Sequence, residues 1–256
     1  MDSSVAAFYD DLADHYHLIY PDWRAAVARH GQLLDALLRA EGLAPPARVL
    51  DCSCGIGTQA IGLALRGYRV HATDLSPAAV ARAAAEARGF GVALTTGVAD
   101  FRALAAEVPG EFDAVLSCDN AVPHLPTDAD LLAAARNMRA KLRPSGLLLI
   151  SIRDYDALGA ERPRSFAPRV FDGTDGRRIV FQVWDWDAAG GAYVVNHFIV
   201  REAGGRWETL HTATRYRALR RDDLAAALRA AGFADLRWHF PANGAYVQPL
   251  VTARAR

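Results

Sequence analysis

Residues 48–60 constrain the fold more than any other part of this 256-residue chain. A short apolar run over 48–52 predicts a strand, which leads into a turn containing Gly55 and Gly57 and then into a helix predicted over 58–66. Glycine lets the backbone approach a ligand closely, and the first turn of a helix presents unpaired N–H groups that suit a carboxylate or phosphate. The segment therefore predicts a ligand site where the first strand of an α/β domain ends.

The alternation of strand and helix continues beyond this turn. Apolar runs predict strands over residues 68–73, 92–96, 112–117 and 147–152. Helical spacing with capping and stop residues predicts helices over 77–88 and 128–142. Such alternation is typical of a parallel sheet with right-handed crossovers, so we expect a doubly wound, Rossmann-like α/β fold.

The residues before this region, 1–46, are helical in pattern. Pro21 ends a first helix whose apolar stripe is formed by Val5, Phe8, Leu12 and Tyr16. A second helix is predicted over 22–40. We expect residues 1–46 to form a helical lid on the domain that occupies 47–256.

Beyond residue 152 the chain becomes rich in β-forming residues. Alternating runs separated by glycine pairs predict an antiparallel meander with strands over 179–187, 193–200 and 207–217. A helix over 221–231 and two strands over 233–240 and 245–252 follow. The meander is therefore expected as an insertion, at about 165–217, into the α/β domain.

Two classes of cofactor fit the glycine turn. Asp74 follows Gly55 by 19 residues and ends the second predicted strand, where a carboxylate can bind ribose hydroxyls. Gly55, Gly57 and Ala60 also match the small positions of a dinucleotide motif, so a nicotinamide cofactor stays open.

Two details favour S-adenosylmethionine. Asp51 stands at the end of the first strand, where a carboxylate suits an ammonium group and is poorly placed beside a pyrophosphate. After the third strand, Ala99, Asp100 and Phe101 offer an acceptor for an adenine amino group beside an aromatic face. We expect S-adenosylmethionine as cofactor and S-adenosylhomocysteine as product.

Composition and charge restrict the classes of partner that we expect for this chain. Lys and Arg together number 29, as do Asp and Glu, and a net charge of zero argues against a nucleic-acid partner. Residues 1–14 are acidic without an apolar core, and no apolar run is long enough for a membrane span, so we expect a cytoplasmic protein without membrane contact. Cys52 and Cys54 lack a second ligand pair, so no metal is expected.

The chain resembles the class I methyltransferases, and within them the glycine and sarcosine N-methyltransferase-like group. The resemblance covers most of the chain and rests on residues 8–23, 48–60, 118–125 and 153–156. Residues 8–23 begin Phe-Tyr-Asp-Asp-Leu-Ala-Asp-His-Tyr, residues 118–125 read Cys-Asp-Asn-Ala-Val-Pro-His-Leu, and 153–156 read Arg-Asp-Tyr-Asp. The resemblance implies a seven-stranded sheet with an antiparallel last strand. Ser53 departs from it, because the group has glycine there.

The resemblance also implies a set of site residues. Cofactor contacts are expected from Tyr16, Asp51, Cys52, Ser53, Gly55, Gly57, Asp74, Leu75, Ala99, Asp100, Phe101, Cys118, Asp119 and Asn120. Contacts with a small-molecule methyl acceptor are expected from Tyr20, Asn120, His124, Arg153 and Tyr155. Tyr16, beside the moving methyl group, and His124, as proton acceptor, are the expected catalytic residues.

Each role has a plainer alternative. Tyr16 can belong to the apolar stripe of its helix, His124 can be structural, and Arg153 can form an internal ion pair with Asp154 or Asp156. N-methylation of a small amine is the leading functional hypothesis. Methylation of oxygen or carbon, for instance of an indole, a nicotinamide oxidoreductase and a non-catalytic cofactor-binding module are the alternatives. A homo-oligomer is also left open.

Overall fold

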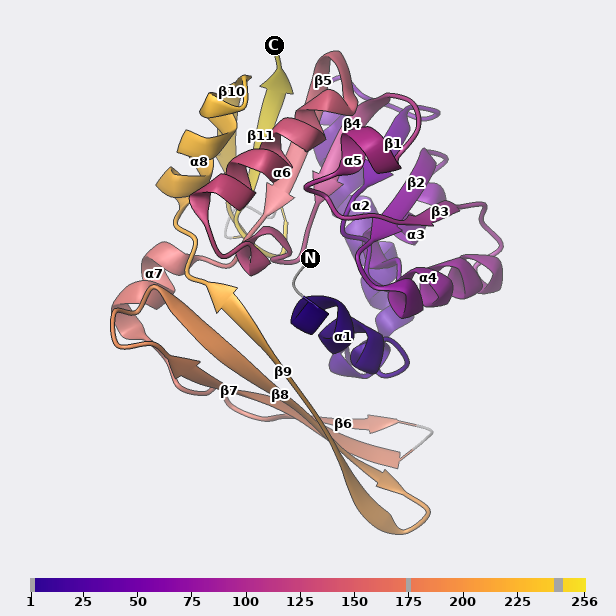
Figure 1. The fold of residues 1–256 in the computed structure, drawn as a ribbon. Coiled ribbons are helices and arrows are strands. Elements are labelled where there is room, and N and C mark those ends of the chain that lie inside the picture. Colours follow the sequence, from indigo (N-terminus) through magenta and orange to yellow (C-terminus); the bar gives the residue numbers. More distant parts are fainter. Residues whose placement is uncertain (1–2, 174–175, 242–245) are drawn as a thin grey trace.

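A seven-stranded sheet forms the centre of the protein (Figure 1). The computed structural model describes residues 3–173, 176–241 and 246–256. In spatial order the strands are β10 (Phe233–His239), β11 (Leu250–Ala255), β5 (Leu142–Ser151), β4 (Phe112–Ser117), β1 (Arg48–Asp51), β2 (Arg69–Asp74) and β3 (Thr95–Val98). β11 pairs antiparallel with both neighbours, whereas the pairs among β1 to β5 are parallel. The predicted sheet, with its reversed last strand, is confirmed.

Helices cover both faces of this sheet. One face packs against α2 (Trp23–Ala40), α3 (Thr58–Ala64) and α4 (Pro77–Gly89), and the other against α5 (Leu104–Glu107), α6 (Asp128–Ala140) and α8 (Arg221–Ala230). Successive strand side chains point to opposite faces. In β1, Val49 is accordingly buried with the first group of helices and Leu50 with the second. The doubly wound arrangement is therefore confirmed.

Two glycines let α2 and α3 pack backbone against backbone. A Cβ on Gly31 would lie 2.3 Å from the carbonyl oxygen of Gly62, and one on Gly62 would lie 2.6 Å from that of Val27. This contact fixes α2 on the sheet, beside the helix that follows the glycine turn. The lid boundary at residue 46 stays a prediction.

A second, antiparallel sheet projects from the α/β body (Figure 1). It follows α7 (Tyr155–Glu161) and contains β6 (Arg169–Gly173), β7 (Gly176–Trp186), β8 (Ala192–Ala203) and β9 (Arg206–Arg217). The meander is confirmed, with one more strand than predicted. β6 escaped prediction because it is a short edge strand whose side chains are mostly exposed, so it lacks an apolar alternation.

The N-terminal helix differs from the prediction. α1 (Ser3–Leu12) ends four residues before Tyr16, which begins the separate 3-10 helix η1 (Tyr16–Ile19). Phe8 and Leu12 pack against the second sheet, whereas Tyr16 also packs toward the cluster of Trp23. A single straight helix could not follow both surfaces.

The predicted start of the last strand was also wrong, because β11 begins at Leu250 rather than at 245. Residue 245 itself lies outside the described residues.

Candidate active site

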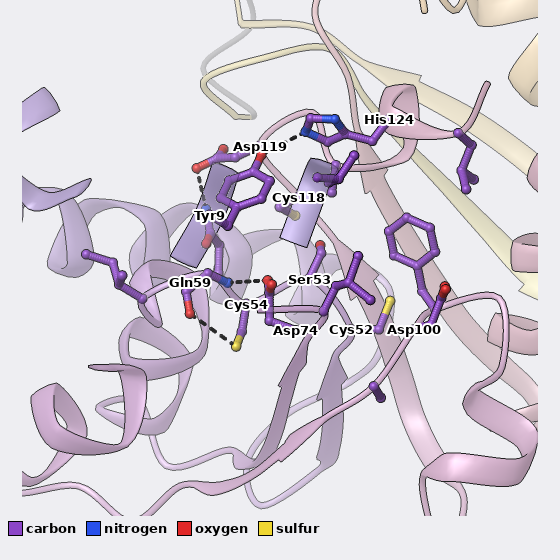
Figure 2. A pocket seen from close by; sticks show the side chains of 18 of the residues that line it. Tyr9, Cys52, Ser53, Cys54, Gln59, Asp74, Asp100, Cys118, Asp119 and His124 are labelled. Carbon is purple, nitrogen blue, oxygen red and sulfur yellow. Dashed lines mark hydrogen bonds between the residues drawn. The ribbon is translucent and has the colours of Figure 1, made fainter. Parts of the chain in front are cut away.

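The loops at the carboxyl ends of β1 to β4 enclose a cavity, here called the first cavity (Figure 2). α1 and η1 close it from the opposite side with Val5, Tyr9 and Tyr16. The expected residues that line it are Tyr16, Cys52, Ser53, Gly55, Asp74, Leu75, Ala99, Asp100, Phe101, Cys118, Asp119 and His124. Four segments distant in sequence thus meet at one sheet edge, where open α/β sheets bind ligands.

The two glycines of the turn have different structural roles. Gly55 has φ of 51° and nothing within 4 Å of where its Cβ would be, so a ligand can approach its backbone. Gly57 has φ of 93° as the N-cap residue of α3, and a Cβ there would lie 2.9 Å from Cδ1 of Ile61. Gly57 therefore serves the turn and the packing behind it. Of the five described non-glycine residues with positive φ, none is Ser53, so that position does not require glycine.

Asp51 lies behind the wall of the first cavity as a buried carboxylate. It is 1% exposed, and its Oδ2 has no hydrogen-bond partner among the described residues. Burial raises the pKa of this carboxyl well above its usual value, although the backbone N–H of Ser53 opposes the shift. An unpaired buried carboxylate oxygen is stabilised by a cation, so the site fits an ammonium group better than a pyrophosphate.

Asp74, at the end of β2, orders the glycine turn. Its Oδ2 accepts from the backbone N–H of Gly55 at 2.8 Å, and its Oδ1 from that of Ser76 at 3.0 Å. Burial raises the pKa of Asp74, while these bonds oppose the shift. Each carboxylate oxygen has two lone pairs, so capacity for ribose hydroxyls remains.

Asp100 lines the first cavity but is engaged by Arg102. The guanidinium of Arg102 donates from Nε and Nη2 to the carboxylate, with the shortest distance 2.7 Å, and also binds Asp130. The role of Asp100 as adenine acceptor stays a prediction, with only its remaining lone pairs free. Phe101 and Ala99 stand beside it on the same wall.

Two consecutive residues after β4 adopt left-handed backbone conformations. Asp119 has φ of 56° and Asn120 of 71°, which is uncommon outside glycine and typical of functional sites. Asp119 faces the cavity and accepts a 2.7 Å hydrogen bond from Gln59 of α3 (Figure 2). Asn120 is buried and lines neither cavity described here; its Oδ1 accepts from the backbone N–H of Arg153 and from the hydroxyl of Tyr155.

A second cavity, of about 610 Å³, adjoins the first. Its wall is formed by α1, η1, the start of α2 and the second sheet, and Tyr9, Tyr16 and Asp119 belong to both walls. Tyr20 and Arg153 of the expected acceptor site also line it. Burial raises the pKa of Tyr9 and of Tyr16 well above the usual value, so both hydroxyls stay protonated near neutral pH.

Arg153 is not paired with Asp154 or Asp156. Both aspartates instead pair with Arg221, at 2.5 and 3.2 Å. Arg153 donates to the hydroxyl of Tyr193 at 2.7 Å, and no carboxylate among the described residues lies within ion-pair distance of it. Its guanidinium also lies over the rings of Trp184 and Tyr216. The internal ion pair offered as the alternative is therefore wrong.

Four expected contacts do not reach a cavity wall: Asp51, Gly57, Asn120 and Tyr155. Tyr155 is 1% exposed and orients Asn120. Gln59, Gln182 and Tyr216 also line the cavities and were not predicted from the sequence. No local pattern marks Gln182 and Tyr216, because only the fold brings these strand residues of the second sheet to the cavity.

Comparison with known proteins agrees with this geometry. The sequence model of a methyltransferase domain matches residues 49–146, which hold the glycine turn, Asp74 and Asp119. The glycine/sarcosine N-methyltransferase of Parasynechococcus marenigrum (strain WH8102) is 33% identical over 170 residues, 66% of this chain and 59% of the relative. Residues 49–146 therefore match a methyltransferase domain, which supports the resemblance of the chain to the class I S-adenosylmethionine-dependent methyltransferases.

Other similar proteins differ in what their names say they methylate. The ubiquinone biosynthesis O-methyltransferase of Xanthomonas campestris pv. campestris (strain B100) is 39% identical over 107 residues, 42% of this chain and 43% of the relative. The solved structure of CalS10, an amino pentose methyltransferase from Micromonospora echinaspora, has a TM-score of 0.71 at 21% identity and covers 89% of this chain and 92% of its own. The chain thus spans about three fifths of the length of the glycine/sarcosine N-methyltransferase and under half of the length of the ubiquinone biosynthesis O-methyltransferase.

S-adenosylmethionine, the cofactor expected from the sequence, agrees with the methyltransferase domain matched over residues 49–146. The residues present fit it, because the buried Asp51 oxygen needs a cation and Gly55 leaves open space beside its backbone. Within the described part of the chain, no group of three or more metal-ligating side chains could hold a metal ion. Nor does that part contain a helix long and apolar enough to cross a bilayer.

Proposed function

We propose that this methyltransferase transfers a methyl group to the nitrogen of a small amine bound in the second cavity. One observation carries the proposal: the two cavities meet at Tyr9, Tyr16 and Asp119. A cofactor in the first cavity and an acceptor in the second would therefore face each other at this junction. Holding reactants in line contributes roughly 7–11 kcal/mol to such a reaction.

The charges around the junction favour an amine that carries an anionic group. Asp119 supplies a carboxylate beside the reacting position, where it can attract an amino group. Arg153, without a carboxylate partner among the described residues, offers a guanidinium fork to an acceptor carboxylate in the same cavity. Arg29 and Arg169 also line this cavity, so its wall carries more cationic than anionic side chains.

The cofactor, when bound, supplies a methyl group on a sulfonium, which a nitrogen lone pair displaces in line to leave S-adenosylhomocysteine. An acceptor that enters as an ammonium must first lose a proton. Tyr9 provides a path, because its oxygen can accept that proton while its own proton moves to Nε2 of His124, 2.9 Å away. A nitrogen–carbon bond forms, a sulfur–carbon bond breaks, and one proton leaves through His124.

The experiment measures S-adenosylhomocysteine release and product mass with S-adenosylmethionine and three classes of acceptor: amines such as glycine and glucosamine, a catechol and an indole. We expect release to depend on an amine. We expect Arg153→Met to raise KM about tenfold or more for a carboxylate-bearing amine and to leave cofactor affinity unchanged. Arg164→Met is the matched control, because that side chain is 83% exposed and pairs with Asp185 outside both cavities.

The other outcomes identify the alternatives. Release with only the catechol or the indole would assign oxygen or carbon methylation. Tight cofactor binding without release for any acceptor would support a non-catalytic module. A cytoplasmic location, a small-molecule rather than nucleic-acid acceptor, and a homo-oligomer also stay proposals.

A further inference from the structure

The inner face of the second sheet carries a polar cluster that methyl transfer at the junction does not use. It consists of Gln182 on β7, His197 on β8, and Thr212 and Thr214 on β9. Gln182 is the register partner of His197, and His197 is the register partner of Thr212, so the three lie side by side across the strands. Gln182 and His197 line the second cavity together with Arg153.

Hydrogen bonds within this face fix the tautomer of His197. The indole N–H of Trp184 can only donate, and it donates to Oε1 of Gln182 at 3.0 Å. The amide nitrogen of Gln182 therefore faces Nδ1 of His197, 3.0 Å away, and donates to it. Because Nδ1 accepts, the proton of the neutral ring is on Nε2.

The ring stays neutral near physiological pH. Burial, with Arg169 and Arg153 nearby, lowers the pKa of His197 to about 4. His197 is 5% exposed, and its Nε2 is buried with no hydrogen-bond partner among the described residues. The hydroxyls of Thr212 and Thr214 are likewise buried and without partners in the described part of the chain. Unpaired buried donors cost free energy, which a ligand that pairs with them would recover.

We propose that the Nε2–H of His197 donates a hydrogen bond to a hydroxyl or carbonyl oxygen of the methyl acceptor, so that the acceptor is a hydroxylated amine rather than a simple amine. The inference rests on the proposed function, because it places the acceptor in the second cavity. Gln182 and His197 are the members of the cluster that line this cavity, so the contact is assigned to His197.

The size of the second cavity agrees with this acceptor class. Its volume is about 610 Å³. Glycine would leave most of this space and the polar cluster unfilled. A ring-sized amine with several hydroxyls can extend from the junction at Tyr16 and Asp119 toward the second sheet.

Calorimetry tests the proposal on the full chain saturated with S-adenosylhomocysteine, so that binding is read without turnover. The probes are glucosamine and cyclohexylamine, two ring amines that differ in their oxygen groups. We expect wild-type protein to bind glucosamine more tightly, and His197→Phe to weaken glucosamine binding about tenfold while changing cyclohexylamine binding less than about twofold. The matched control is His211→Phe, since His211 is exposed, pairs with Asn196 and does not line the second cavity.

Wild-type protein without a preference for glucosamine, or His197→Phe with the preference intact, would overturn the inference. ¹⁵N NMR of wild-type protein gives a check that needs no variant: at pH 7 we expect the His197 proton on Nε2, and a proton on Nδ1 would overturn the assignment. Glucosamine binding that depends on His197, without methylation of any amine, would support this contact and count against the proposed reaction. Amine methylation by the wild-type protein, with glucosamine binding unaltered in His197→Phe, would support the proposed reaction and count against the contact with His197.

Discussion

The hydroxyl of Tyr9 lies 2.9 Å from Nε2 of His124, which joins the N-terminal helix to the loop after β4 (Figure 2). The other ring nitrogen of His124, Nδ1, lies 3.2 Å from the carbonyl oxygen of Arg215, which can only accept. Nδ1 therefore carries the proton of the neutral ring, and Nε2 accepts from Tyr9. The hydroxyl of Tyr216 lies 3.4 Å from the Tyr9 oxygen, and its ring packs against that of His124 with 4.1 Å between ring centroids. With its proton donated to His124, the Tyr9 oxygen keeps a lone pair that can accept another proton.

The first prediction concerns this hydrogen bond. Tyr9→Phe keeps the ring but removes the proton path, so kcat for methyl transfer should fall about 100-fold. The affinity for S-adenosylhomocysteine should change less than about threefold, because the aromatic wall of the first cavity remains. Steady-state kinetics and calorimetry measure the two quantities. Tyr68→Phe is the control, since the Tyr68 hydroxyl binds Asp35 far from the cavities. An unchanged kcat in Tyr9→Phe would rule out the path.

The second prediction concerns pH and Asp51. Burial raises its pKa well above the usual 3.8, so the folded protein holds this proton at pH values where the unfolded chain has released it. The corresponding stability is present below about pH 4 and is lost as pH rises through the raised pKa. Asp51→Asn should remove this part of the pH dependence.

Urea unfolding of the cofactor-free protein from pH 4 to pH 9 measures the effect as the difference between wild type and Asp51→Asn. Asp113→Asn controls for the loss of one carboxylate, because Asp113 lies at the amino edge of the sheet. Parallel pH profiles for wild type and Asp51→Asn would contradict the prediction.

The third prediction concerns Asp74. From sequence, Asp74→Ala should weaken cofactor binding and leave the fold intact. The structure adds a cost, because the substitution also leaves the N–H groups of Gly55 and Ser76 without their acceptor. We expect S-adenosylhomocysteine affinity to fall at least tenfold and the free energy of unfolding to fall by about 1–3 kcal/mol.

Calorimetry and urea unfolding read these two effects separately. Asp113→Ala is matched, since Asp113 also accepts from a backbone N–H, that of Arg48, but lies away from the first cavity. It should lose stability and keep its affinity. Equal affinity in wild type and Asp74→Ala would refute the ribose role.

The fourth prediction concerns helix packing. In Gly62→Ala the added methyl meets the carbonyl oxygen of Val27 at 2.6 Å, so α2 and α3 must separate. We expect the free energy of unfolding to fall by about 1–3 kcal/mol. Gly159→Ala, in α7, has nothing within 4 Å and should be neutral or slightly stabilising. The measurement is the urea concentration at the midpoint of unfolding for wild type and both variants. Equal midpoints for wild type and Gly62→Ala would show that the close contact is dispensable.

Much of the first cavity was predictable because its residues belong to local motifs. The strand–turn–helix at Gly55 and the aspartates that end β1 and β2 follow each other in sequence at fixed intervals. Parallel strands bring their carboxyl ends to one edge, so residues from these loops had to meet. The sequence did not indicate the partners of these residues: Asn120 accepts from the backbone N–H of Arg153, and Asp100 is engaged by Arg102.

The sequence by itself predicted the parallel core and a ligand site at the edge where the glycine turn lies, because periodicity, glycine and capping residues are local. The reversed last strand was implied only by the resemblance to the class I methyltransferases, which rests on short motifs. Only the tertiary structure decided how α1 and the second sheet close the site. It placed Tyr9 against His124, left Arg153 without a carboxylate among the described residues, and set the tautomer of His197 through Gln182. Such contacts join residues far apart in the chain, and their geometry depends on packing that no local pattern encodes.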